Sequence, residues 1–283
     1  MIRTRLTANS RGYLTTTVSS SRTAVVCGLL NRRSIAWGCV EALLERQFDV
    51  LVTCQNDRIL KANQSLFSTR KIKGVVCNVT CDESLQALFQ QDQVCDFMQD
   101  RPLDALVHSL AYAPMEAMKG PNASLLNTTR RDFFLTCDVS AYSLIALTKH
   151  ALPYLLKASS PSITALTYVG SQLAVPNYNV MGPAKAALES IVRGLALELG
   201  PQNVRVNAVS AGPIATVAAK GGIRNFTEMQ THVVQHSPLR QNVTIKQVGQ
   251  LVANLTDLHG ITGQTIFCDS GYSIVSGPPS SHN

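Results

Sequence analysis

The segment AVVCGLLNRRSIAWG, residues 24–38, joins a short apolar run to a stretch with helical periodicity. The apolar run before Gly28 predicts a strand, and the periodicity from Ser34 to about Arg46 predicts a helix with Ser34 as its N-cap. A glycine turn followed by a helix start allows backbone N–H groups to face a pyrophosphate. The spacing is not G-x-G-x-x-G, so this segment alone leaves two hypotheses, a structural turn and a phosphate-binding turn.

Strand-like and helix-like stretches alternate along the rest of the chain. Buried-strand patterns follow at residues 48–53, 75–76, 105–107, 163–168, 204–209 and 265–268, and helical patterns include 83–89, 141–156 and 184–199. This alternation predicts a parallel sheet covered on both faces, and right-handed crossovers make such a sheet doubly wound. We therefore expect one Rossmann-like α/β domain over residues 23–283, built on a seven-stranded parallel sheet.

Composition excludes several classes of protein. The 283 residues are 45% hydrophobic and 15% charged, which suits a large folded core. The most apolar stretch, residues 144–156, is interrupted by Lys149, His150 and Pro153, so we expect no membrane span. The net charge of +7 comes from scattered basic residues. This pattern argues against nucleic acid as a partner and favours phosphates or an acidic carrier protein.

The eight cysteines form no CxxC pair, and most lie in apolar runs where a small buried side chain suffices. Paired close ligands are therefore missing, and we expect no metal. This usage of cysteine favours a reducing compartment.

Residues 1–22 are expected to be a disordered or targeting extension outside the domain. The first 40 residues contain no Asp or Glu, and Arg3, Arg5, Arg11 and Arg22 are separated by Ser and Thr. This composition is typical of organelle transit peptides, and a disordered tail is the alternative. We expect a cytoplasmic protein, or a plastid or mitochondrial one if the extension is a transit peptide.

The pair Tyr178 and Lys185 is the most informative feature for chemistry. They are seven positions apart, which on a helix is almost two turns, so we expect both side chains to point the same way. A tyrosine hydroxyl can donate to a developing oxyanion, and a lysine cation can hold a ribose and make that hydroxyl more acidic. Tyr168 can reach the same space. The alternative to a catalytic role is a structural one, in which both tyrosines are core residues and the lysine buries only its aliphatic stem.

The tip of the second predicted strand bears on the choice of cofactor. Gln55 can hydrogen-bond the free ribose hydroxyl of NADH, whereas Arg58 leaves room for the 2′-phosphate of NADPH. We expect NADH, with NADPH as the alternative.

With these motifs assembled, the chain resembles the enoyl-acyl-carrier-protein reductases, a divergent branch of the short-chain dehydrogenases/reductases. The matching stretches are SIAWG (34–38), QND (55–57), HSLAYA (108–113), PNYNVMG (176–182) and VRVNAVSAGPI (204–214). The Tyr-x6-Lys spacing is specific, because ordinary members of the superfamily use Tyr-x3-Lys, and Gly182 stands where their lysine would fall.

The resemblance implies NADH-dependent reduction of trans-2-enoyl thioesters in fatty acid biosynthesis, with acyl carrier protein as partner and a homotetrameric assembly. It implies that Tyr178 hydrogen-bonds the thioester carbonyl, that Tyr168 lines the acyl pocket and assists, and that Lys185 holds the nicotinamide ribose. Ala113 would contact the substrate. The positions implied to bind the cofactor are Gly28, Ser34, Ile35, Gln55, Asn78, Val79, Leu110, Lys185, Ile214, Ala215, Thr216, Val217 and Ala218, and the last five begin a mobile substrate loop.

The chain departs from the family pattern at several positions. Asn78 stands where the family usually has Asp, and its amide oxygen can still accept a hydrogen bond. Thr227 and Glu228 fall where some relatives carry basic residues for the carrier protein, and Lys220 and Arg224 are candidate replacements.

Two other functions remain as alternatives. A carbonyl reductase of the same superfamily would have a lysine four positions after the tyrosine, and this spacing is absent at Tyr178. A non-enzymatic nucleotide-binding regulator would show a damaged Tyr/Lys pair, and here both residues are intact.

Overall fold

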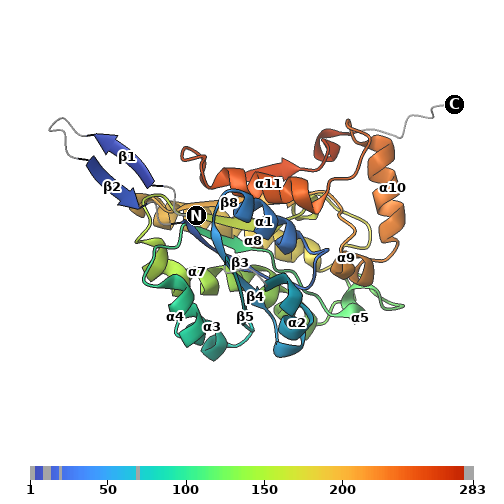
Figure 1. Ribbon diagram of the computed structural model, residues 1–283. Coiled ribbons are helices and arrows are strands. Elements are labelled where there is room, and N and C mark those ends of the chain that lie inside the picture. Colours follow the sequence, from blue (N-terminus) through green and yellow to red (C-terminus); the bar gives the residue numbers. More distant parts are fainter. Residues whose placement is uncertain (1–3, 9–13, 19–20, 68–70, 277–283) are drawn as a thin grey trace.

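The computed structural model describes residues 4–8, 14–18, 21–67 and 71–276. Its centre is a sheet of seven parallel strands in the order β5-β4-β3-β6-β7-β8-β9 (Figure 1). The strands are β3 (Thr23–Cys27), β4 (Asp49–Cys54), β5 (Ile72–Val76), β6 (Ala105–His108), β7 (Ser162–Thr167), β8 (Arg205–Ala211) and β9 (Thr265–Cys268). The predicted seven-stranded, doubly wound parallel sheet is confirmed.

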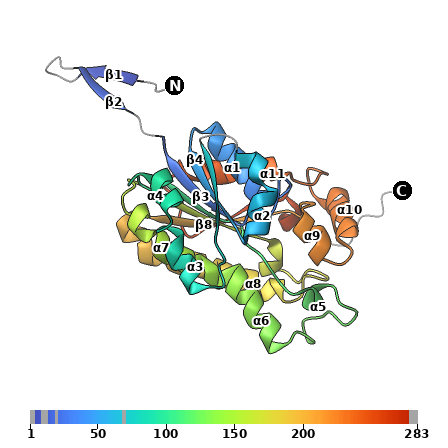
Figure 2. The same ribbon diagram turned by 60° about the horizontal axis from the view of Figure 1, so that its bottom comes forward.

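Helices cover both faces of this sheet (Figures 1 and 2). The helices are α1 (Ile35–Glu45), α2 (Asp57–Ala62), α3 (Asp82–Leu88), α4 (Asp92–Met98), α5 (Met115–Met118), α6 (Arg130–Cys137), α7 (Ser143–Leu155), α8 (Met181–Leu199), α9 (Val217–Gly222), α10 (Phe226–His236) and α11 (Ile245–Leu255). A π-helical segment, Asp138–Tyr142, joins α6 to α7, so the helix predicted from residue 141 is preceded by a wider turn. Short 3-10 segments lie at Gln64–Phe67, Val169–Ser171, Gly200–Gln202 and Tyr272–Ile274.

The hydrophobic core is divided by the sheet into two clusters. Val25 and Cys27 of β3 face one cluster, which contains buried apolar residues of α3, α7 and α8. Ala24 and Val26 face the other, which contains those of α1 and α11. Because successive strand side chains alternate between the faces, a strand buried on both sides is a continuous apolar run. That is why short apolar runs located the strands correctly.

Two glycines allow α1 and α11 to pack backbone against backbone. A Cβ atom added to Gly38 would lie 2.1 Å from the carbonyl oxygen of Ile245. A Cβ atom added to Gly249 would lie 2.0 Å from the carbonyl oxygen of Gly38. Gly38 therefore serves the helix crossing, whereas Gly28 belongs to the turn at the end of β3.

We expect Gly249→Ala to lower the free energy of unfolding by roughly 1–3 kcal/mol, the usual cost of overpacking. The clash is with backbone atoms, which cannot rotate away, so the helices must separate despite the higher helix propensity of alanine. Urea denaturation measures the change. The matched control is Gly194→Ala in α8, where a Cβ meets nothing within 4 Å and stability should be unchanged or higher. Equal stability of Gly249→Ala and wild type would contradict this account.

The N-terminal segment forms an antiparallel hairpin, which sequence reasoning did not predict. β1 (Thr4–Ala8) pairs with β2 (Leu14–Val18) in a sheet of its own. Figure 2 shows this hairpin projecting from the body of the molecule. The extension predicted for residues 1–22 lies partly outside the described residues, and its division from the domain and its targeting role stay predictions.

Within residues 4–8, 14–18, 21–67 and 71–276, no helix has both the length and the apolar character to cross a membrane. The same described residues contain no group of three or more His, Cys, Asp or Glu side chains arranged to hold a metal ion.

Candidate active site

The predicted site residues gather at the carboxyl end of the sheet. Gly28 follows β3, Gln55 follows β4, and Tyr168 follows β7. After β3 the chain continues to β4 and β5 on one side of β3, and β6 then lies on the opposite side of β3. Such a switch in strand order opens a crevice at the carboxyl ends of the strands, where open α/β sheets bind ligands.

Gly28 forms a turn that only glycine can adopt without strain. Its φ is +96°, and an added Cβ would lie 2.4 Å from the carbonyl oxygen of Ser109 and 2.9 Å from the side chain of Leu110. The structure therefore places Gly28 and Leu110 side by side, as expected for two cofactor-binding positions. Glycine is therefore required here by the close approach of the Ser109 backbone and the Leu110 side chain.

Ser34 occupies the N-cap position of α1, as predicted, but its hydroxyl does not cap the helix. The Oγ atom instead accepts a hydrogen bond from the N–H of Asn31 at 2.9 Å, which fastens the loop before the helix. The first N–H groups of α1, beginning at Ile35, are thus left without a side-chain acceptor and are available to an anion.

The predicted adenosine positions lie after β4 and β5. Gln55 is exposed, and Val79 is buried. The Oδ1 atom of Asn78 accepts hydrogen bonds from the backbone N–H of Thr80 at 3.2 Å and from its hydroxyl at 3.0 Å. The amide oxygen expected to accept from adenine is therefore engaged within its own turn, and the amide nitrogen is the group that can still donate outward.

Tyr178 does not lie on the helix that carries Lys185, contrary to the helical geometry assumed for the pair. α8 begins at Met181, and Tyr178 stands in the preceding turn between Asn177 at φ 63° and Asn179 at φ 38°. Asparagine adopts the left-handed region more readily than other non-glycine residues, so these two positions end helical continuity. The Nδ2 atom of Asn179 donates to the Ala117 carbonyl at 3.0 Å and anchors the turn.

Tyr178 and Tyr168 meet edge to face. Their ring centroids are 4.9 Å apart with an interplanar angle of 64°. Gly170 makes room for this arrangement, because an added Cβ would lie 2.4 Å from the Tyr178 ring. The structure thus brings together the two tyrosines that sequence analysis assigned to catalysis. Burial raises the pKa of both phenols, so both remain protonated donors at neutral pH.

Lys185 is buried, with its side chain directed to the same end of the sheet. Its ammonium donates to the Leu166 carbonyl at 2.8 Å and to the Leu110 carbonyl at 3.2 Å. Burial lowers the pKa of Lys185 to about 8, against an opposing effect of the Glu189 carboxylate. Lys185 is therefore a fully buried cation with two of its three donors used.

His108 and Glu189 are two buried polar residues near Lys185 to which sequence analysis gave no role. The Nε2 atom of His108 lies 2.7 Å from the Ser143 hydroxyl, and that hydroxyl donates to the Val139 carbonyl at 2.7 Å. The ring is therefore protonated at Nε2. Burial and the Lys185 charge lower the pKa of His108 to about 3, so the imidazole is neutral.

Glu189 follows Lys185 by four residues and lies on the buried face of α8 with Leu188. A carboxylate on an apolar helix face, one turn after a lysine, is a signal that the sequence does contain.

The segment predicted to cover the nicotinamide, Ile214 to Ala218, leads from β8 into α9. Thr216 caps α9, accepting from the N–H of Ala219 at 3.0 Å. The predicted substrate loop is therefore helical from Val217 to Gly222. Ala113, the predicted substrate contact, packs against the apolar cluster that contains Tyr178.

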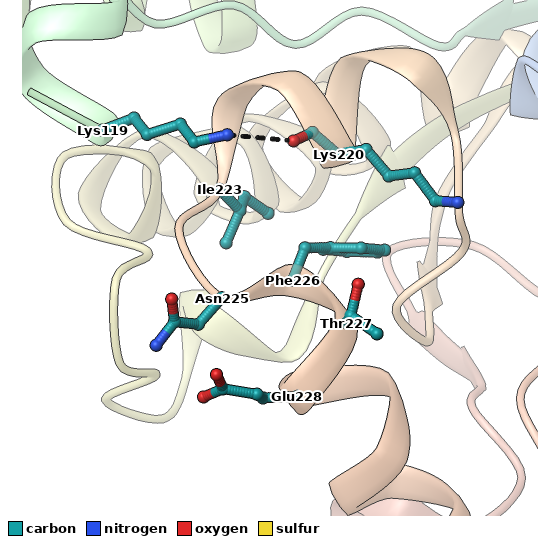
Figure 3. Close-up of a pocket in the computed structure, with 7 residues that line it drawn as sticks. All are labelled: Lys119, Lys220, Ile223, Asn225, Phe226, Thr227 and Glu228. Carbon is teal, nitrogen blue, oxygen red and sulfur yellow. Dashed lines mark hydrogen bonds between the residues drawn. The ribbon is translucent and has the colours of Figure 1, made fainter.

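A pocket of about 350 Å³ lies beside this segment, at the junction of α9 and α10 (Figure 3). The Lys119 ammonium donates to the Lys220 carbonyl at 3.4 Å across the pocket. The lining residues are Lys119, Lys220, Ile223, Asn225, Phe226, Thr227 and Glu228. None of the predicted catalytic residues lines it, but Ile223 also packs against the Tyr178 cluster, so the pocket adjoins the site from outside.

Comparison with known proteins decides the family. A family profile described as Enoyl-(Acyl carrier protein) reductase matches residues 28–273. The chain belongs to the enoyl-acyl-carrier-protein reductase family. A curated relative, the NADH-dependent enoyl-acyl-carrier-protein reductase FabI of Neisseria meningitidis, is 41% identical over 258 residues, which are 88% of this chain and 94% of the relative.

Solved structures of the family agree with the fold. The enoyl-acyl-carrier-protein reductase of Bacillus cereus, solved with NADP+ and indole naphthyridinone, gives a TM-score of 0.83 at 35% identity over 90% of this chain and 97% of its own. The reductase of Anaplasma phagocytophilum, solved with NAD, gives 0.81 at 33% identity over 92% and 94%. Membership of this family confirms the predicted resemblance.

Proposed function

We propose that this chain is an NADH-dependent enoyl-acyl-carrier-protein reductase that reduces trans-2-enoyl thioesters in fatty acid biosynthesis. The observation that carries the proposal is the edge-to-face pair of Tyr168 and Tyr178, with the buried Lys185 bonded to the Leu166 carbonyl two residues before Tyr168. Gly182 argues against the ordinary carbonyl-reductase arrangement, because it stands where that arrangement needs a lysine, and an added Cβ there would lie only 3.0 Å from the Gly170 carbonyl oxygen.

The residues present fit a dinucleotide. Gly28 keeps the end of β3 free of a side chain where the chain packs against Ser109 and Leu110, and the N-terminus of α1 has no side-chain cap. Gly28, Ser34 and Ile35 would hold the pyrophosphate and adjoining ribose, and Gln55, Asn78 and Val79 would surround the adenosine. Leu110 and the segment from Ile214 to Ala218 would lie along the nicotinamide. When bound, NADH supplies the hydride that adds to the β-carbon of the enoyl thioester.

The tyrosines and the lysine have separate tasks. Negative charge moves to the carbonyl oxygen as the double bond is reduced, and the Tyr178 hydroxyl donates a hydrogen bond to that oxygen. Its raised pKa keeps the proton on the phenol, so the group acts as a donor and not as a base. Lys185 holds the ribose with its remaining N–H, Tyr168 lines the acyl pocket with Ala113, and burial excludes water from the oxyanion.

NADH is the proposed reductant because Gln55 can accept or donate to the free ribose hydroxyl. Relatives are named for NADH, and one solved relative holds NADP+. Arg58 stands near the same strand end, so NADPH is the second candidate.

The acyl carrier is proposed to approach over α9 and the start of α10. Lys119 and Lys220 line the outer pocket there, and their charges suit an acidic carrier. Arg224 donates to the carbonyls of Lys119 and Gly120, so it also supports the loop after α5. Glu228 opposes this attraction, and we expect weaker carrier docking than in relatives with a basic residue at that position.

A single assay tests the activity, the reductant and the carrier. Purified protein is mixed with crotonyl groups carried on acyl carrier protein or on coenzyme A, with NADH or NADPH, and the loss of reduced-nicotinamide absorbance is followed. We expect the highest rate with NADH and the carrier-bound substrate. The absence of oxidation with every enoyl chain length would favour the nucleotide-binding regulator.

We also propose a homotetramer. The surface formed by α6 to α8 leaves large apolar side chains exposed, including Phe134, Tyr142 and Leu197. Exposed apolar side chains that lie together mark protein contacts, and we infer a subunit contact at this surface. A cytoplasmic location, or a plastid or mitochondrial one with a cleaved N-terminal segment, is proposed from the composition of residues 1–22.

A further inference from the structure

Glu189 is a buried carboxylate that the proposed reaction does not use. It lies on α8, one helical turn after Lys185, and its side chain is only 4% exposed. Burying a charged carboxylate is unfavourable unless other groups satisfy it, so its retention at this place needs a reason.

Three neutral donors from one corner of the fold satisfy the carboxylate. Its Oε1 atom accepts from the Thr167 hydroxyl at 2.8 Å and from the Ser171 hydroxyl at 2.5 Å. Its Oε2 atom accepts from the Gln172 amide at 3.2 Å. Thr167 ends β7, and Ser171 and Gln172 close the short turn that follows. Glu189 thus fastens this turn to α8.

The fastened turn carries the groups that shape the site. Tyr168 lies between Thr167 and Ser171, and Gly170 forms the surface on which the Tyr178 ring rests. Lys185 lies on α8, the helix to which Glu189 fastens this turn. It donates to the carbonyl of Leu166, the residue before Thr167. A shift of the turn against α8 would therefore change the spacing of both tyrosines and the lysine together.

We propose that Glu189 is a positioning residue that holds the Tyr168 turn against α8 and keeps the Lys185 ammonium charged during cofactor binding. This role rests on the proposed function of Tyr178 and Lys185. Glu189 does not touch substrate or cofactor in this role. It acts through the Thr167 and Ser171 hydroxyls and through its negative charge.

The charge contribution has a defined sign. The ionisable groups that act on Lys185 are Glu189 on α8 itself and His108 from β6. The Tyr178 phenol, from the turn before α8, adjoins Tyr168 and Glu189. His108 is neutral, and both phenols stay protonated, so Glu189 supplies the negative charge that opposes deprotonation. Without it, the pKa of Lys185 falls below its present value of about 8.

The test compares wild type with Glu189→Gln, which keeps the size of the side chain and removes its charge. The Kd for NADH is measured by fluorescence titration from roughly pH 6 to pH 10, spanning the ordinary range over which a perturbed lysine titrates. Affinity should weaken as Lys185 loses its proton. We expect the midpoint of this loss to lie about one pH unit lower in Glu189→Gln. Glu198→Gln, an exposed position on the same helix, is the matched control and should leave the midpoint unchanged.

Ser171→Ala separates position from charge. It removes one hydrogen bond to Glu189 and keeps the carboxylate, so we expect kcat to fall about tenfold, which corresponds to the loss of one hydrogen bond to a charged group, while the pH midpoint stays at its wild-type value. If Glu189→Gln does not fold, this folded variant decides: wild-type kcat in Ser171→Ala would overturn the positioning role. An unmoved pH midpoint in folded Glu189→Gln would overturn the charge role.

Failure of the proposed function would give a different experimental result from failure of the role proposed for Glu189. If wild type binds NADH but reduces no enoyl thioester, the reductase activity is wrong, and the pH midpoint of binding still tests Glu189. If wild type is active and the midpoints coincide, the charge role of Glu189 alone is wrong.

Discussion

We expect Tyr178→Phe to lower kcat by about 10²- to 10³-fold, the effect usually seen when one oxyanion donor is removed, and to leave the Kd for NADH nearly unchanged. The hydroxyl contributes only when charge develops on the carbonyl oxygen, so its loss affects the transition state more than the bound cofactor. Steady-state rates with a crotonyl thioester give kcat, and fluorescence titration gives the Kd.

The phenylalanine variant should fold because the ring contacts remain. Tyr178 is 7% exposed and packs edge to face with Tyr168 over Gly170, and a phenyl ring fills the same space. Tyr142→Phe is the matched control, since that tyrosine is exposed on the π-helical segment and should leave kcat unchanged. Wild-type turnover in Tyr178→Phe would remove the assigned role and direct attention to Tyr168.

The sheet could be predicted because each of its strands contains a short apolar run. β3 is buried along its whole length, and the run from Ala24 to Cys27 needs no alternation to be recognised as a strand buried on both faces. The predicted strand 265–268 coincides with β9, although it lies at the sheet edge and is only partly buried. Local composition determines these elements, so the sequence contains enough information to find them.

The sequence selected the candidate residues of the site but not their conformation. Tyr178 was expected on a helix, and the positive φ angles of Asn177 and Asn179 place it in a turn. The Tyr-x6-Lys motif was sufficient to select Tyr178 as a candidate. The direction of the Tyr178 ring depends on its contact with Gly170, which belongs to another segment of the chain. No periodicity in the sequence indicates such a contact.

Long-range partners explain the other omissions. Glu189 has the spacing of a neighbour of Lys185, but its importance depends on donors at Thr167 and Ser171 that only the fold brings near. Gly38 was predicted only as a residue of the helix after Gly28, and the structure shows that it meets Gly249 at a helix crossing. In each case the deciding neighbour is distant in sequence.

Lys185→Met should weaken NADH binding by roughly ten- to a hundredfold, which is the value of one hydrogen bond to a charged group, about 1.5–3 kcal/mol. Two of the three ammonium donors already bond the carbonyls of Leu110 and Leu166, so one is left for the ribose. Methionine keeps a flexible side chain of similar length without the charge, which limits the cavity that alanine would leave. Fluorescence titration near neutral pH measures the loss.

The pH dependence distinguishes this role from a packing defect. The ammonium is the binding form and its pKa is about 8, so wild-type affinity should be full well below that pH and decline as the pH rises through it. Lys185→Met has no proton to lose, and its weaker Kd should be flat over the same range. A variant that merely packed badly would keep the wild-type slope, because the titrating group would lie elsewhere. Lys149→Met, on α7, is the matched control and should preserve both the affinity and the slope. Wild-type affinity in Lys185→Met would show that the cofactor is held without this lysine.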